Sequence, residues 1–338
     1  VGPLPKISKL ALQKHYLTPW EEFGGDAWPQ WLGSIDQFCA SIGRLINATG
    51  DEICPQPNLA SGFSAYLTAI AKLSKNKSKH RVLMHQDAFA SMGFVVNGLA
   101  QSYGLELVLV HGNPNDLSAW TKELSKGHVL ACLFTHVHSN TSMKSDIVSL
   151  VELAKEHDTY ALVDIAQSVG IVPVDAKIWG ADALFGSCVK WLCGGPGAGF
   201  MFVEATQICK LNPDPVGWFS HEDPFEFDIK QYTAANNARR FWGGTPSVAP
   251  YVTAFASINM ILNIGIDQIA LHNLELKRYL LQHLPNNVKI KPTEDELHQQ
   301  GGSLCIGCND MDSAAIKLTK AGVKYDRRGD IFRLSLHI

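Results

Sequence analysis

The chain has 338 residues, of which 46% are hydrophobic and 18% charged, and its formal net charge is −3. This composition is typical of a large folded core and argues against disorder. The near-neutral charge provides no electrostatic footprint for nucleic acid, so we expect no nucleic-acid partner. Because no apolar run reaches the roughly 20 residues that span a bilayer and no secretory signal begins the chain, we expect no membrane association.

The eight cysteines are scattered through apolar segments of a long chain, which favours reduced thiols over a disulfide framework. We therefore expect a cytoplasmic protein. Cys305 and Cys308 are three residues apart in an expected strand and so point to opposite faces, while His136 and His138 have no further ligands nearby in sequence. We expect no metal site.

The first 50 residues look helical, and strand and helix patterns alternate from residue 51. The expected strands are continuous apolar runs, which are typical of a mostly parallel sheet covered by helices on both faces. These strands cover 81–86, 105–112, 128–137, 160–165, 181–189 and 197–203, and the helices between them cover 58–73, 91–104 and 146–158. Beyond them we expect one long helix over about 247–284, then strands 301–308 and 330–338 around a helix over 312–322.

We therefore expect an α/β protein in four parts. An N-terminal helical segment (1–50) packs on the small domain or the active site. A large three-layer α/β/α domain (51–246) binds the ligand, a linking helix (247–284) follows, and a small α+β domain (285–338) ends the chain.

Two charges end apolar, strand-like runs: Asp164 closes one run, and Lys190 closes the next, just before a Gly/Pro loop. Burying an acid and an amine apart is costly, since each loses its water. A bound pyridoxal phosphate (PLP) gives both a role, because a lysine bonds this cofactor covalently and an acid pairs with its pyridine nitrogen.

Further polar residues lie at expected strand ends or helix starts, where ligands bind in such sheets. Ser61 begins a helix and is a candidate phosphate contact, although most such serines are plain caps. Gln167 is a candidate for the cofactor's phenolic oxygen or for a helix cap, and Thr245 for a phosphate contact or a turn.

Several motifs together resemble the class V aminotransferase group of fold type I PLP enzymes, and most of all kynureninase and its relatives. The similarity covers essentially the whole chain. The segments that carry it are D-x-A-Q (164–167), Lys190 with GGPG (194–197), GWFSH (217–221), RRFWGGTP (239–246), QQGGSLCI (299–306) and GVKYDRRGDIFR (322–333).

The resemblance implies a fold and a set of roles. The fold is the PLP-dependent transferase-like fold, assembled as a homodimer with active sites at the interface. Lys190 would hold the cofactor covalently, Asp164 would pair with its pyridine nitrogen, and Arg333 would clamp the α-carboxylate of an amino acid substrate. The remaining cofactor contacts would come from Ala60, Ser61, Thr135 and Gln167, from Met84 or His85 against the ring, and from Trp218 and Thr245 at the phosphate across the interface.

Departures from the family pattern leave the substrate open. Val189 stands where kynureninases carry tyrosine and desulfurases histidine, and Gly244 replaces a substrate-recognition asparagine. No cysteine lies in 309–333, which argues against sulfur transfer. We expect Lys190 to remove the Cα proton of an amino acid. The alternatives are kynureninase-like hydrolytic C–C cleavage, transamination, desulfurase- or lyase-type elimination, and a degenerate binding protein without catalysis.

Overall fold

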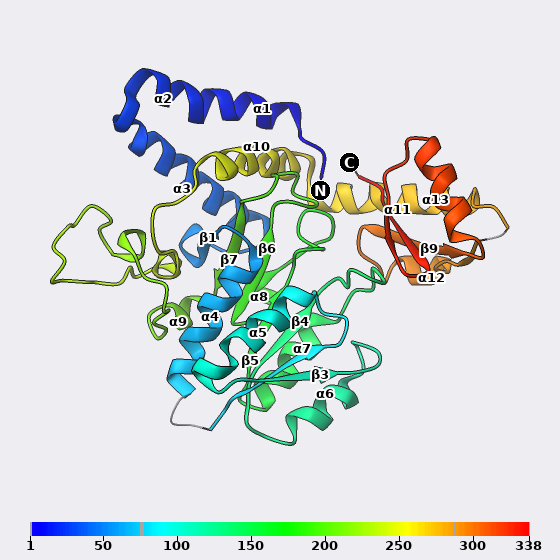
Figure 1. Cartoon of the computed structure of the whole chain (residues 1–338), viewed down its shortest axis with the longest axis horizontal. Helices are drawn as coiled ribbons and strands as arrows, with labels where there is room; N and C mark the ends of the chain where they lie inside the picture. The colour runs from blue at the N-terminus through cyan, green and yellow to red at the C-terminus, as the bar shows by residue number, and fades with distance from the viewer. Residues whose placement is uncertain (1, 75–77, 287, 338) are drawn as a thin grey trace.

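The computed structural model describes residues 2–74, 78–286 and 288–337 and contains two sheets (Figure 1). The larger sheet has seven strands in the order β1–β7–β6–β5–β4–β2–β3. Only β7 runs antiparallel to its neighbours, which confirms the expected mostly parallel sheet. The strands are β1 (Ile53–Gln56), β2 (Arg81–His85), β3 (Glu106–Val110), β4 (Val129–Thr135), β5 (Tyr160–Asp164), β6 (Ala183–Ser187) and β7 (Gly199–Val203).

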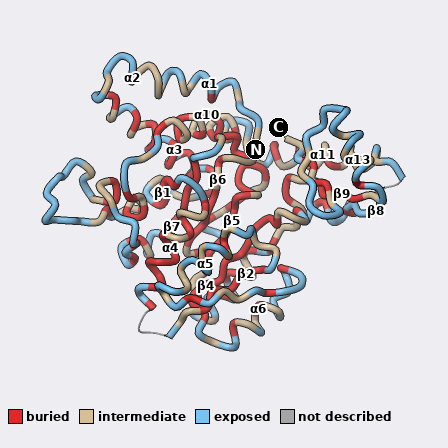
Figure 2. The backbone as a smooth tube through the Cα atoms, in the orientation of Figure 1, coloured by how far each residue is buried: buried red, intermediate tan, exposed pale blue. Residues whose placement is uncertain are grey.

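Helices cover both faces of this sheet, as the three-layer prediction requires. Successive strand residues point to opposite faces, so Val82 and Met84 enter one core while Leu83 enters the other. The strands are buried along nearly their whole length except the edge strand β3, of which only Val110 is buried (Figure 2). One face is covered by α4 (Leu59–Ser74) and α5 (Ala90–Tyr103), the other by α3 (Trp28–Leu45), α6 (Leu117–Leu124), α7 (Ile147–Glu156), α8 (Ala176–Trp179) and α10 (Ala249–Ile264).

The N-terminal segment is helical and lies along α10 (Figure 1). Ser8 donates from Oγ to the carbonyl of Thr253 at 2.9 Å. Before the first helix, the N–H of Gly2 donates to the carbonyl of Val189 at 2.9 Å, so the start of the described chain touches the turn that carries Lys190. The elements before α3 are α1 (Lys6–Leu12), a π-helical turn (Gln13–Leu17), α2 (Thr18–Phe23) and a 3-10 turn (Gly24–Ala27).

The prediction of one long helix over 247–284 is wrong. The segment forms α10 and α11 (Ile266–Gln282), whose axes differ by 81°. The break falls at Gly265, whose φ of 91° is one that residues with a side chain rarely adopt. Apolar spacing continues through the break, so periodicity alone conceals it. In the described part of the chain no single helix is long and apolar enough to cross a membrane, although this bent pair passes the same length-and-composition test.

A four-stranded antiparallel sheet in the order β10–β11–β9–β8 packs beside α11 and forms the predicted small C-terminal unit. Its core includes Leu304, Ile306, Phe332 and Leu334. Its elements are β8 (Val288–Ile290), α12 (Glu294–Leu297), β9 (Ser303–Cys308), α13 (Met311–Lys320), β10 (Asp326–Arg328) and β11 (Ile331–Ser335).

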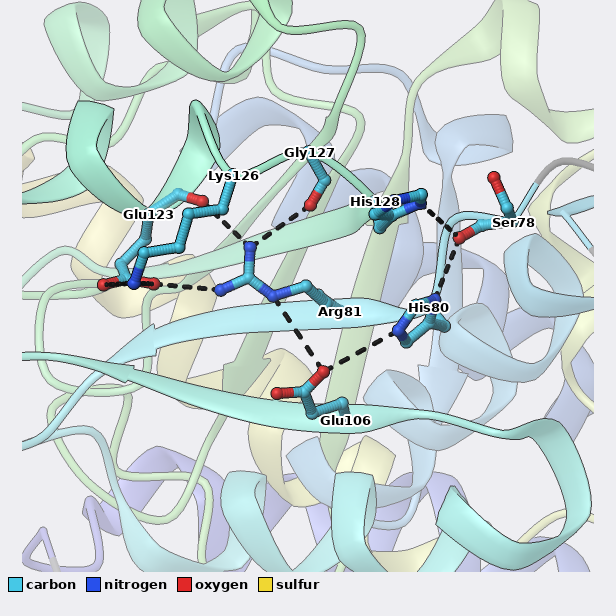
Figure 3. Close-up of polar contacts among 8 residues, drawn as sticks. All are labelled: Ser78, His80, Arg81, Glu106, Glu123, Lys126, Gly127 and His128. Atoms are coloured by element: carbon cyan, nitrogen blue, oxygen red, sulfur yellow. Dashed lines mark hydrogen bonds and ion pairs between the residues drawn. The ribbon is translucent and has the colours of Figure 1, made fainter.

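A buried arginine links β2 to β3, to α6 and to the loop before β4 at the amino end of the large sheet (Figure 3). Arg81 begins β2, and its guanidinium donates to the carbonyls of Glu123 and Gly127 at 2.9 and 3.2 Å. It also bonds the Glu123 carboxylate at 2.9 Å and lies 4.0 Å from Glu106 of β3. This network lies at the amino ends of the strands, at the opposite end of the sheet from the carboxyl ends where the candidate site residues lie.

Replacing Arg81 with methionine should lower the free energy of unfolding by about 2–4 kcal/mol, since Glu123 and two carbonyls lose a buried partner. Lys126 is the matched control because it bonds the same Glu123 carboxylate from an exposed position, with 54% of its side chain accessible. Lys126→Met should cost less than about 1 kcal/mol. Urea denaturation measures both, and equal losses would contradict this account of the network.

Candidate active site

The carboxyl ends of the parallel strands gather the predicted residues along one edge of the sheet. β2 ends at His85, β4 at Thr135 and β5 at Asp164. Thr135 and Asp164 are direct neighbours in the register of β4 and β5. Lys190 lies in the turn after β6, the strand on the other side of β5. The topology therefore brings the acid and the amine to the same edge.

Asp164 is a buried carboxyl, 6% exposed, whose Oδ1 accepts the N–H of Ala166 at 2.8 Å. Burial raises its pKa, while Lys190 and the Ala166 hydrogen bond pull the pKa the other way. The neighbouring Thr135 hydroxyl is buried without a hydrogen-bond partner in the described part of the chain. An unpaired buried hydroxyl beside a sparsely bonded acid marks a place where a ligand would supply the missing partners.

Lys190 is half-buried, and burial lowers its pKa. Asp164 opposes this shift, whereas Arg333 and Arg328 reinforce it. The amine opens on a cavity of roughly 130 Å³, which Gln167 and Arg333 also line. The remaining lining residues are Gly2, Trp191, Ser303, Ser335 and His337.

Arg333 projects from β11 of the small sheet toward the loop that follows β4. Its Nη1 donates to the carbonyl of Ser139 at 2.7 Å, and its Nη2 forms an ion pair with Asp326. Its buried Nε has no partner among the described residues. The guanidinium thus bridges the small unit to the loop after β4 of the large sheet.

The ring of Phe89, which sequence reasoning missed, lies close to the Lys190 amine. Met84 is buried in the core, and the His85 ring bonds the Gly112 carbonyl through Nε2 at 2.9 Å and the Asp87 N–H through Nδ1 at 3.2 Å. The Phe89 ring, 47% exposed, lies 5.7 Å from the Lys190 Nζ. Phe89 is the N-cap residue of α5. An aromatic residue just before an expected helix is the signal in the sequence that could have indicated it.

Ser61 lies in the first turn of α4, after β1, whose carboxyl end is on the same edge as that of β6. Its N–H and hydroxyl both bond the Asn58 side chain, at 3.0 and 3.1 Å, so Ser61 is engaged in a local cap, with Ala60 beside it. Trp218 and Thr245 meet each other, with Nε1 donating to Oγ1 at 3.2 Å. Neither lines the Lys190 cavity.

No group of three or more potential metal ligands occurs among the residues that the structure describes. Burial raises the pKa of the Cys305 and Cys193 thiols to about 11, so both are neutral near pH 7.

Residues 35–324 match the family model described as "Aminotransferase class-V". The chain belongs to this family. Among curated relatives of this class V aminotransferase chain, an uncharacterized aminotransferase of Bacillus subtilis (YcbU) is 26% identical over 250 residues, which are 74% of this chain and 65% of the relative. The Deinococcus radiodurans kynureninase is 27% identical over 285 residues, covering 82% of this chain and 67% of the enzyme. The chain therefore spans only about two thirds of the length of these relatives.

Solved structures show the same fold for this class V aminotransferase chain. An apo cysteine desulfurase from Thermococcus onnurineus superposes with a TM-score of 0.85 at 20% identity, covering 99% of this chain and 87% of that one. C-DES, a cystine C-S lyase, in a mutant with glycine covalently linked to its PLP cofactor, gives 0.85 at 18% identity, covering 99% and 89%. The expected PLP-dependent transferase-like fold is thereby confirmed.

Proposed function

We propose that the chain is a PLP-dependent enzyme that acts on an α-amino acid, with kynureninase-like hydrolytic C–C cleavage as its reaction. The observation that carries the proposal is the buried Asp164 carboxyl, beside the unpaired Thr135 hydroxyl and on the same sheet edge as Lys190. These groups fit the cofactor. An acid can pair with its pyridine nitrogen, a free hydroxyl can hydrogen-bond it, and an amine of lowered pKa can bond it covalently.

When bound, PLP supplies an electron sink for the electrons released at the substrate Cα. Asp164 would keep the pyridine nitrogen protonated, and Lys190 would remove the Cα proton, since its lowered pKa leaves more of the amine unprotonated. Arg333 would bind the α-carboxylate through its planar guanidinium. Gln167 shares the cavity and would contact the cofactor's phenolic oxygen.

The kynureninase relatives support C–C hydrolysis, while transamination and desulfurase- or lyase-type elimination are the alternatives. Sulfur transfer is disfavoured because 309–333 contains no cysteine and the Cys305 thiol is held neutral. Incubating the PLP-loaded protein with L-kynurenine, L-cysteine and a panel of common amino acids separates the reactions by product. Alanine from kynurenine supports the proposal. Keto acid or sulfide instead supports an alternative, and absence of any turnover favours the degenerate binding protein.

A homodimer is part of the proposal, because Trp218 and Thr245 lie together outside the Lys190 cavity and would contact a partner's cofactor phosphate. The loop that follows Trp218 exposes Phe225, Phe227 and Ile229, which a partner would cover. Light scattering at micromolar concentration should give twice the chain mass, and a monomer would contradict the proposed homodimer.

The free state of all eight cysteines supports the expected cytoplasmic location.

Phe89 would pack against the cofactor ring, since its ring lies beside the Lys190 amine. Phe89→Ala should weaken PLP retention about tenfold through lost aromatic contact. Phe94→Ala, at an exposed position on the same α5, should leave retention unchanged. Equilibrium dialysis against PLP measures both variants, and equal retention would exclude Phe89 from the site.

A further inference from the structure

His337 follows β11 and lies beside the turn that carries Lys190, at the cavity that Gly2 also lines. The preceding residue is anchored, because the Leu336 carbonyl accepts from Asn273 Nδ2 at 2.7 Å. The imidazole stacks on the Trp191 indole, with ring centroids 5.0 Å apart and planes 25° from parallel.

The same ring also contacts Cys193, two residues beyond Trp191, because its Nε2 lies 3.5 Å from the Cys193 Sγ. Cys193 in turn donates its N–H to the Lys190 carbonyl at 3.1 Å. One imidazole therefore contacts Trp191 and Cys193, and Cys193 is joined to Lys190 by a backbone hydrogen bond.

Cys193 and His337 are not a nucleophilic pair. Burial raises the pKa of Cys193 to about 11, and burial lowers the pKa of His337. Both groups are neutral near pH 7, so no thiolate–imidazolium pair forms. The contacts of His337 are those of a neutral ring that holds the backbone in place.

Arg333 and His337 are four residues apart on one segment, and both line the cavity into which Lys190 opens. We propose that His337 is a positioning residue, whose contacts with Trp191 and Cys193 fix the lysine turn to the strand that carries Arg333. The distance between the reactive amine and the group that binds the α-carboxylate is thereby set by one short stretch of chain. This inference rests on the proposed function.

Three variants separate the effect of the aromatic ring from that of its nitrogen contact, and both from a loss of folding. His337→Phe retains a ring that can stack on Trp191 but removes the ring nitrogen that contacts Cys193. His337→Leu removes both the ring and that nitrogen, and His337→Gln retains a polar nitrogen without an aromatic ring. The control is His283→Phe, because His283 is an exposed histidine on the same unit whose ring packs 4.2 Å from that of Tyr279.

The probe is PLP itself, and the measurements on the full chain are the rate of covalent PLP capture and the pH midpoint of the visible band of the bound cofactor. We expect His337→Phe and His337→Leu to slow capture at least about tenfold and to shift the midpoint. His337→Gln should stay within about threefold of the original chain, and His283→Phe should match it.

Unchanged capture and midpoint in a folded Phe or Leu variant would overturn the inference, and so would failure of the Gln variant to restore capture. If the original chain itself captures no PLP, the proposed function fails and this inference fails with it. Normal capture by the original chain together with unaffected variants removes the inference alone.

Discussion

Replacing Lys190 with alanine should abolish covalent retention of PLP and reduce turnover by at least about 10³-fold, since we propose this residue as both the attachment point and the base. After treatment with borohydride, the original chain should keep the cofactor through denaturation, and the variant should release all of it. Absorbance of the denatured, desalted protein measures the difference.

Lys144 provides a matched control, because it is another half-buried lysine whose pKa is lowered by burial. It does not line the Lys190 cavity. Lys144→Ala should therefore retain the cofactor as fully as the original chain does. Retention by the Lys190 variant, or loss in both variants, would show that the attachment point lies elsewhere.

Replacing Asp164 with asparagine should lower turnover by about 100-fold or more while leaving PLP attached to Lys190. The amide is nearly the same size, but it has no negative charge to keep the pyridine nitrogen protonated. Turnover of whichever amino acid proves active, together with the visible spectrum of the bound cofactor, measures the effect.

The same change should stabilise the cofactor-free protein at pH 7. Because burial raises the pKa of Asp164, the folded state binds this proton more tightly than the unfolded state does. The ionised carboxylate therefore destabilises the fold once the pH exceeds the unfolded pKa, and the penalty grows until the folded pKa is passed. Asparagine carries no such penalty, so the apo variant should melt at a higher temperature.

Asp182 is the control for turnover and for the cofactor spectrum, since it is another largely buried acid with a raised pKa, and its carboxylate accepts a backbone N–H at 2.8 Å, from Ala161. It lies at the amino end of β6, away from the candidate site. Asp182→Asn should leave the cofactor spectrum unchanged. Full turnover in Asp164→Asn would contradict the assigned role.

The parallel sheet and the placement of Asp164 and Lys190 at the same edge of it were predictable, because each residue follows an apolar run and the carboxyl ends of parallel strands lie together. The position of Arg333 in the Lys190 cavity was predicted from motif resemblance alone, since nothing in its own segment shows that β11 faces the loop after β4.

Other features depend on contacts between distant segments. Strand β1 contains Pro55 and pairs only at the edge of the sheet, with β7, so its short sequence carries little strand signal. The sharp bend at Gly265 interrupts a helical pattern that runs on through it. Phe89 enters the proposed site only because the Lys190 amine lies near the start of α5.

The central claim is that Lys190 is the cofactor lysine of a PLP enzyme. It is tested most directly by loading the purified protein with PLP, reducing it with borohydride and mapping the modified peptides by mass spectrometry. The account predicts a single pyridoxyl-phosphate addition, on the peptide that contains Lys190. Modification of a different lysine, or no stable modification at all, would contradict it.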